Sequence, residues 1–279
     1  MSKAQTKKRV LSVVVALVAV AIGLVIVFPI IYTVTTAFKP RAEVLTYPPT
    51  VFPESFGYFG NFKAALERAP LFRFMVNSLI MGVMGCVLRI TFALLAAYAF
   101  AYFEFKGKNF LFYLLLATMM LPGDTLMVTN YLTVSQLGLV NTYLGMCITS
   151  LVGATQMFML RQNFKTLPKS LRDAAFIDGC GDIRYLLRVI LPMSKPVVLT
   201  LMVQAFVTLW NAYLWPLLVT NKTNMRTVQV GVTMLTTWED NNYSLVLAAV
   251  AIMLVPSFIL FVILRRNITR GITAGALVG

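Results

Sequence analysis

Residues 167–196 read LPKSLRDAAFIDGCGDIRYLLRVILPMSKP, a polar and basic stretch that lies between two long apolar runs. Its first part predicts a short helix. Ser170 is a good N-cap, and Asp173 follows three residues later, close to the spacing of a capping box. Gly179 and Gly181 then supply a flexible break at the C-terminal end of this helix.

The second part of the stretch predicts another short helix. Asp182 can cap it, and the apolar residues of Ile183–Leu191 alternate with Arg184 and Arg188. Pro192 is expected to end it. Physical reasoning alone leaves two interpretations open. The pair of helices is either an amphipathic hairpin that rests on lipid headgroups or an element that docks onto another protein.

The composition places this stretch in a membrane protein. Of the 279 residues, 59% are hydrophobic and 12% are charged, whereas about a quarter of the residues in soluble domains are charged. Several separate apolar runs approach or exceed the roughly 20 residues that cross a bilayer as a helix. We therefore expect an all-α membrane protein. Six transmembrane helices are predicted, at 10–33, 78–102, 109–128, 143–160, 196–219 and 244–264.

The distribution of Lys and Arg predicts the orientation, because cytoplasmic loops carry the positive excess. With both termini in the cytoplasm, sixteen basic residues lie on the inner side and seven on the outer side, and Arg89 lies within a span. The net charge of +14 then faces anionic lipid, and no nucleic-acid partner is needed to explain it. The predicted organisation is a cytoplasmic N-terminus (1–9), a first transmembrane helix (10–33), an extracytoplasmic loop (34–77), a five-helix core (78–264) that includes the cytoplasmic segment 161–195, and a cytoplasmic tail (265–279).

The residue inventory argues against an enzyme. Histidine is absent, which removes imidazole acid–base chemistry and most zinc sites. Cys86, Cys147 and Cys180 are scattered, as is typical of packing residues rather than of a disulfide framework or a metal site. The predicted spans hold no paired carboxylates, so we expect no catalytic residue and no metal site.

One pattern resembles a known family. Asp173-Ala-Ala-x-x-Asp-Gly-x-Gly181, followed by Ile190-Leu-Pro192, is similar to the cytoplasmic signature of binding-protein-dependent ABC importer permeases. This chain departs from the family's pattern at Asp173 and Cys180, where the family usually has Glu and Ala, and both changes are conservative in charge or size. The run Trp210–Pro216 (WNAYLWP) and the Gly-rich C-terminal tail resemble the carbohydrate-uptake branch, which includes the smaller maltose-type and the glycerol-phosphate-type permeases.

The resemblance implies a type I ABC importer permease fold, with the 170–192 hairpin as the element that couples it to a separate ATPase. It implies inward transport of a sugar or related polar solute across a prokaryotic inner membrane. The implied partners are a second permease subunit, a dimer of ATPase subunits and an extracytoplasmic solute-binding protein. ATP and Mg²⁺ are expected on the ATPase, since this chain has no phosphate loop, and the chain itself is expected to bind no cofactor. The coupling role falls on Arg172, Asp173, Ala174, Ala175, Asp178, Gly179, Leu191 and Pro192.

Arg89 is the first candidate for the solute pathway. A charge in the middle of a span costs at least about 2.5–3.5 kcal/mol, so Arg89 should face a cavity or a partner rather than lipid. It either holds a polar or anionic solute or is tied to polar groups within the bundle. Trp210, Asn211 and Tyr213 are further candidates, because aromatic faces and an amide suit sugars. Aromatic residues also gather at the membrane interface, and Trp215 is assigned to such a belt.

A secondary transporter, or another polytopic membrane protein without ATPase coupling, is the alternative function. Secondary transporters usually show intramembrane acids for ion coupling. In this chain every Asp and Glu falls in a loop or at the end of a predicted span. The sequence therefore favours the ATP-driven importer.

Overall fold

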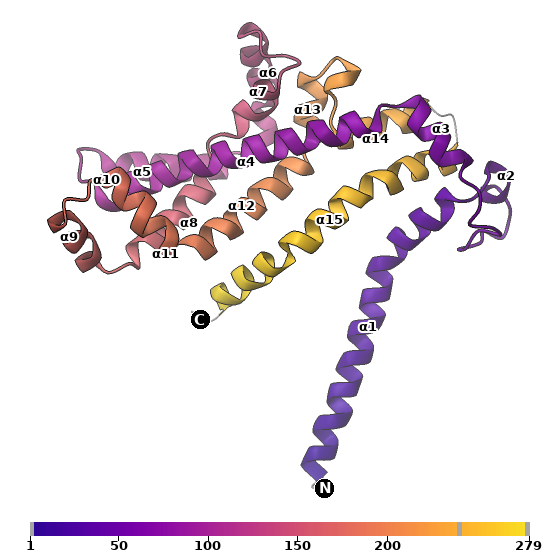
Figure 1. Cartoon of the computed structure of the whole chain (residues 1–279), viewed down its shortest axis with the longest axis horizontal. Coiled ribbons are helices and arrows are strands. Elements are labelled where there is room, and N and C mark those ends of the chain that lie inside the picture. The colour runs from indigo at the N-terminus through magenta and orange to yellow at the C-terminus, as the bar shows by residue number, and fades with distance from the viewer. Residues whose placement is uncertain (1–2, 239–241, 277–279) are drawn as a thin grey trace. The chain divides into compact units, whose positions relative to one another are not determined.

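The computed structural model describes residues 3–238 and 242–276, and Figure 1 shows how they are arranged. These residues form helices joined by loops and contain no strand. The α-helices are α1 (Lys3–Ala37), α2 (Arg41–Val44), α3 (Gly60–Arg68), α4 (Leu71–Tyr102), α5 (Lys108–Ala117), α6 (Met127–Gln136), α7 (Tyr143–Cys147), α8 (Ala154–Lys165), α9 (Lys169–Ile177), α10 (Asp182–Tyr185), α11 (Leu191–Met193), α12 (Lys195–Trp210), α13 (Leu214–Val219), α14 (Val228–Trp238) and α15 (Tyr243–Ala276). Four 3₁₀ turns and one π-helical turn join them: η1 (Thr118–Met120), η2 (Gly123–Leu126), η3 (Ile148–Ser150), η5 (Thr223–Met225) and the π-helical η4 (Leu186–Ile190).

The chain divides into two compact units. The first comprises the described residues up to Leu71 together with Val232–Val255. The second comprises Phe72–Gly231 and the described residues from Pro256 onward. Helix α15 therefore contributes its first part to one unit and its remainder to the other.

In the first unit, α1 is apolar on every side. Almost all side chains between Leu11 and Ile30 are exposed. A helix that is hydrophobic all round and uncovered by its own chain suits a lipid environment. The C-terminal end of α1 is fixed by the buried Asn61, whose Nδ2 donates to Ala37 O at 2.9 Å and to Lys39 O at 2.8 Å.

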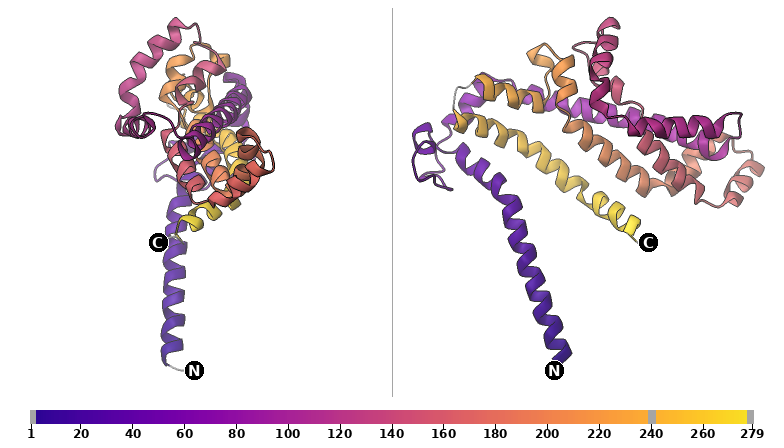
Figure 2. Two further views of the ribbon diagram at one scale, coloured as in Figure 1. Left: turned by 90° about the vertical axis from the view of Figure 1, so that its left-hand side faces the viewer. Right: turned by 180° about the vertical axis from the view of Figure 1, so that it is seen from behind.

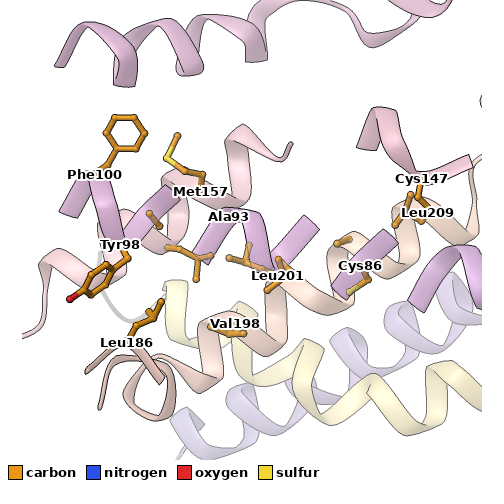
Figure 3. Close-up of a cluster of buried hydrophobic side chains, with 14 of the residues drawn as sticks. Cys86, Ala93, Tyr98, Phe100, Cys147, Met157, Leu186, Val198, Leu201 and Leu209 are labelled. Atoms are coloured by element: carbon orange, nitrogen blue, oxygen red, sulfur yellow. The ribbon is translucent and has the colours of Figure 1, made fainter. Parts of the chain in front are cut away.

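In the second unit, a hydrophobic core runs along α4 (Figure 3). Ala93 and Ala97 of α4 are 2% and 0% exposed, and small residues of this kind let membrane helices approach closely. The Cys86 thiol of α4 donates to the Met202 carbonyl of α12 at 3.2 Å. Leu160 of α8 belongs to the same core and is fully buried. The core thus joins α4, α8 and α12.

The prediction of an all-α membrane protein is confirmed, whereas the count of six spans stays a prediction. Two of the described helices are long and apolar enough to cross a membrane unbroken, Leu11–Ala37 and Leu71–Tyr102. Two bent pairs can each supply one more span: Tyr143–Ser150 with Ala154–Lys165, bent by 56°, and Asp182–Met193 with Lys195–Trp210, bent by 85°. The other two predicted segments contain shorter apolar helices, Lys108–Met120 and Tyr243–Ile259.

Three of the predicted spans contain breaks. The helical segment that begins with α5 ends at Met120, because Pro122 has no backbone N–H with which to continue it. The predicted span 143–160 is interrupted at Leu151–Gly153, and the predicted span 196–219 at Asn211–Tyr213. Non-helical backbone at membrane depth is tolerated where it is buried in protein or lines a cavity. We therefore expect these breaks to be buried in protein or to line a cavity.

The first and last helices extend beyond the predicted spans, and the predicted domain boundaries stay predictions. Helix α1 already begins at Lys3, within the predicted N-terminal segment 1–9. Helix α15 continues to Ala276, through most of the predicted tail 265–279. Residues 1–2 and 277–279 of these two segments lie outside the described residues.

Candidate functional site

The predicted coupling helix is α9, which lies at one end of the second unit (Figures 1 and 2). None of its residues is buried. The prediction that Ser170 caps this helix is wrong. Pro168 takes the cap position with an extended ψ of 131°, and the Leu171 N–H donates to Pro168 O at 3.2 Å. The proline turns the chain directly into the helix, which leaves Ser170 inside the first turn.

The turn after α9 is a Schellman motif centred on Gly179. This glycine has a φ of 76°, a left-handed conformation that glycine adopts without steric cost. Its N–H donates to Phe176 O at 3.0 Å, and the Cys180 N–H donates to Ala175 O at 2.9 Å. A Cβ atom on Gly179 would meet no atom of the described residues within 4 Å, its two chain neighbours aside. The predicted break is therefore a fixed turn that is open to the surroundings.

The second helix of the hairpin differs from the prediction at both ends. Gly181 takes the cap position of α10, so Asp182 is the first helical residue rather than the cap. Pro192 does not end the helix. The π-helical turn η4 precedes it, and the wider turn accommodates a residue that lacks an N–H. The helix runs on to Met193, and the 85° bend comes at Ser194.

The hairpin is tied to α4 through the carboxylate of Asp182. The Tyr98 hydroxyl donates to Asp182 Oδ1 at 2.6 Å. Arg172 Nη2 lies 3.5 Å from the same oxygen, and Arg172 Nη1 donates to Tyr102 O at 3.4 Å. The Arg172–Asp182 pair is partly exposed, so the short bond from Tyr98 is the stronger of the two links. Arg172 therefore points back toward α4, and its part in coupling stays a prediction.

The outward side of the hairpin forms a small continuous surface. We define the coupling surface as Asp173, Ala174, Ile177, Asp178 and Gly179, all of which are exposed. Ile177 is 87% exposed, and it lies three residues after Ala174 and four after Asp173, so the three share one helix face. Ile177 is uncovered and lies between the carboxylates of Asp173 and Asp178, so it offers a partner an apolar anchor. Gly179 has no side chain, so a partner can approach the backbone of the turn closely.

Other predicted coupling residues lie elsewhere. Ala175 packs against the core of the second unit. Leu191 and Pro192 lie in α11, where Leu191 also packs against that core and Pro192 is exposed. Ile177 was missed from the sequence, although its spacing from Ala174 places it on the same face.

A cavity of about 690 Å³ lies within the second unit. It is bordered by the helix breaks near Gly123 and Val152, and Arg89 of α4 lines it. The expectation that Arg89 faces a cavity is confirmed, while its part in transport stays a prediction. Polar groups from Thr118, Asn130, Thr149 and Thr155 share the lining with apolar side chains.

The predicted aromatic pathway residues are not brought to this cavity. Trp210 is 7% exposed, and its indole Nε1 donates to Ser257 Oγ at 3.2 Å. Asn211 is exposed and caps the end of α12, and Tyr213 precedes α13.

Trp215, which was assigned to an interfacial belt, lines the cavity instead. Its Nε1 donates to Gly145 O at 3.2 Å. The break at Asn211–Tyr213 places Trp215 on a different helix from Trp210. The sequence signal for this break in the span is the presence of Asn211 and Pro216, two residues unfavourable within a helix, on either side of Tyr213.

The described residues contain no group of three or more Cys, Asp or Glu side chains that could hold a metal ion. The cavity offers one charged group and several polar groups to a polar molecule, and the exposed hairpin offers a surface to a partner.

The sequence pattern of the family described as "binding-protein-dependent transport system inner membrane component" matches residues 89–273. The chain belongs to this family. The match includes both Arg89 and the coupling surface. The earlier resemblance to importer permeases is thereby confirmed, and so is the expectation of a transport subunit.

Two relatives show how far the similarity extends. The chain is 33% identical over 260 residues to the arabinooligosaccharides transport system permease protein AraQ of Halalkalibacterium halodurans, across 92% of this chain and 93% of that protein. It is 32% identical over 263 residues to the sn-glycerol-3-phosphate transport system permease protein UgpE of Brucella melitensis, across 90% of this chain and 92% of that protein.

A solved structure has the same fold. It is a chain from the crystal structure of a bacterial ABC transporter involved in the import of the acidic polysaccharide alginate. The TM-score is 0.83, with 20% identity, and the match covers 95% of this permease and 98% of that chain. The predicted importer permease fold is confirmed.

Proposed function

We propose that this permease moves a sugar or related polar solute inward and that ATP is hydrolysed on a separate pair of ATPase subunits. In this proposal the ATPase docks on the coupling surface, and ATP and Mg²⁺ bind to it rather than to the permease. A second permease subunit and an extracytoplasmic solute-binding protein complete the importer. Both termini of this chain lie in the cytoplasm, as the distribution of Lys and Arg favours.

The observation that carries the proposal is the geometry of α9. A nine-residue helix with no buried residue is held at its first turn by Arg172, which donates to Tyr102 O of α4 and pairs with Asp182 of α10, the acceptor of the Tyr98 hydroxyl. A helix that is anchored at its base and uncovered at its tip can transmit the movement of a docked partner to the membrane helices. The names of the two relatives support the solute class, since one names arabinooligosaccharides and the other a phosphorylated polyol.

The function is tested by solute uptake into proteoliposomes that contain the complex co-purified with this permease. We expect uptake of a labelled sugar or polyol to require both the solute-binding protein outside and hydrolysable ATP inside. A non-hydrolysable ATP analogue should support none. Uptake that proceeds without ATP and follows an imposed ion gradient would contradict the proposal and favour a secondary transporter.

A further inference from the structure

The cavity beside Arg89 contains the start of a helix. Helix α8 begins at Ala154 after the break at Leu151–Gly153, and its cap residue Gly153 offers no side chain to cap it. The first hydrogen bond at this end runs from the Met157 N–H to Gly153 O at 2.9 Å. The three N–H groups before Met157 are therefore not used by the helix, and Ala154 and Thr155 both line the cavity.

Arg89 lies against this helix start. A Cβ atom on Gly153 would come within 2.7 Å of Arg89 Nε, so the absence of a side chain at Gly153 makes room for the guanidinium group. Arg89 Nε is buried and has no hydrogen-bond partner among the described residues. Of the lining side chains that the structure describes, Arg89 is the only charged one. A full positive charge and the positive end of a helix dipole thus meet at one place.

A second buried polar group, the side chain of Gln156, lies beside Gly153. Gln156 is 3% exposed, and its Oε1 has no hydrogen-bond partner among the described residues. This oxygen lies 2.3 Å from the position that a Gly153 Cβ would occupy. Buried polar groups are nearly always paired in folded proteins. Gln156 is not among the residues that line the cavity and its Oε1 can only accept a hydrogen bond, so the unpaired donor that indicates an anionic ligand is Arg89 Nε.

On the basis of the proposed function, we infer that this cavity is a solute subsite that binds an oxyanion, a carboxylate or a phosphate, carried by a hydroxylated solute. The guanidinium group of Arg89 and the free N–H groups at the start of α8 bind the oxyanion. The volume of about 690 Å³ accommodates a small sugar. The Trp215 side chain and the threonine hydroxyls of the lining suit the rest of a sugar.

The subsite is tested by binding to the complete complex in detergent, with three probes that share one hexopyranose ring: D-glucose, D-glucuronate and D-glucose 6-phosphate. We expect at least one of the two anions to bind about tenfold or more tightly than glucose, since hydrogen bonds to charged groups are the stronger ones. The anion that binds more tightly distinguishes a carboxylate from a phosphate. If neither anion binds better than glucose, the inference is overturned.

Two variants locate the binding. Arg89→Gln should remove the preference for the anion, so that the ratio of anion affinity to glucose affinity falls to about one. Arg41→Gln, with the same loss of charge at an exposed position of α2, is the control and should bind as the wild type does. Unchanged anion binding in the Arg89→Gln complex would also overturn the inference.

Ala154→Pro is a second, independent test that remains available if the Arg89→Gln variant does not fold. Proline is well tolerated at the first position of a helix, and it removes one N–H from the proposed oxyanion site. It should weaken binding of the anion about tenfold or more, the order of one hydrogen bond to a charged group, and unchanged binding would contradict the role of the helix start. The outcome is separable from that of the proposed function, because ATP-driven uptake can stand while the anion preference fails, and the reverse.

Discussion

Replacing Gly179 by leucine will leave the permease folded and inserted but will uncouple ATP hydrolysis from solute delivery. The Cβ atom of the leucine would meet no atom of the described residues within 4 Å, its two chain neighbours aside, so the side chain is expected to project into whatever docks on the coupling surface. Obstruction at the centre of an interface typically costs about 2 kcal/mol or more, which weakens docking about thirtyfold. The measurement is ATPase activity stimulated by the solute-loaded binding protein, together with uptake, in reconstituted membranes.

Gly138→Leu is the matched control. Gly138 follows α6 in the same Schellman geometry, with a φ of 68°, a bond from its N–H to Ser135 O at 3.0 Å and open space around its Cβ position. Both variants therefore carry the same left-handed backbone cost of about 1–2 kcal/mol. We expect coupling to survive in Gly138→Leu. Equal loss in the two variants would attribute the effect to backbone strain, and full coupling in Gly179→Leu would contradict the docking assignment.

Gly145→Ala is expected to destabilise the second unit strongly. A Cβ atom on Gly145 would lie 2.1 Å from the backbone oxygen of Leu139, and a backbone atom cannot move aside as the tip of a side chain can. Gly145 is also held at its N–H by Thr142 Oγ1 at 3.0 Å and at its carbonyl by Trp215. The substitution should destabilise the unit by about 3 kcal/mol, the upper end for overpacking.

The expected readout is a lower yield of monodisperse permease in detergent and a lower melting temperature. Gly23→Ala in α1 is the control, because its Cβ would meet nothing within 4 Å. Alanine is favoured over glycine in a helix by about 1 kcal/mol, so this variant should be at least as stable as the wild type. Wild-type stability of Gly145→Ala would contradict the close approach of α7 to Leu139.

The sequence predicts the parts of the fold that single residues or strong composition dictate. The apolar runs identify the membrane class, and the pair of glycines after Asp178 predicts the turn that ends α9. Arg89 within a span predicts a cavity, because an unsolvated charge is too costly in lipid. Each of these follows from a local physical constraint.

Other features depend on contacts that no local pattern reveals. Ser170 is a good cap by type, but Pro168 sets the start of the helix. Arg172 looks like a docking residue on the hairpin, yet Asp182 and the Tyr102 carbonyl hold it against α4. Trp215 lines the cavity because the break at Asn211–Tyr213 places it on a separate helix. A hydropathy average over the whole predicted span does not reveal such a break.

The central claim is that the partner ATPase sits on the outward side of α9, and cross-linking tests it most directly. A photoreactive amino acid is placed at Ile177, which is 87% exposed, and in a second permease at Tyr47, which is 94% exposed in the predicted extracytoplasmic loop. We predict that illumination of the intact, ATP-hydrolysing complex joins the probe at Ile177 to the ATPase subunit, and that the probe at Tyr47 gives no such adduct. An intact complex that yields no ATPase adduct from Ile177, or one that yields it from Tyr47, would contradict the account.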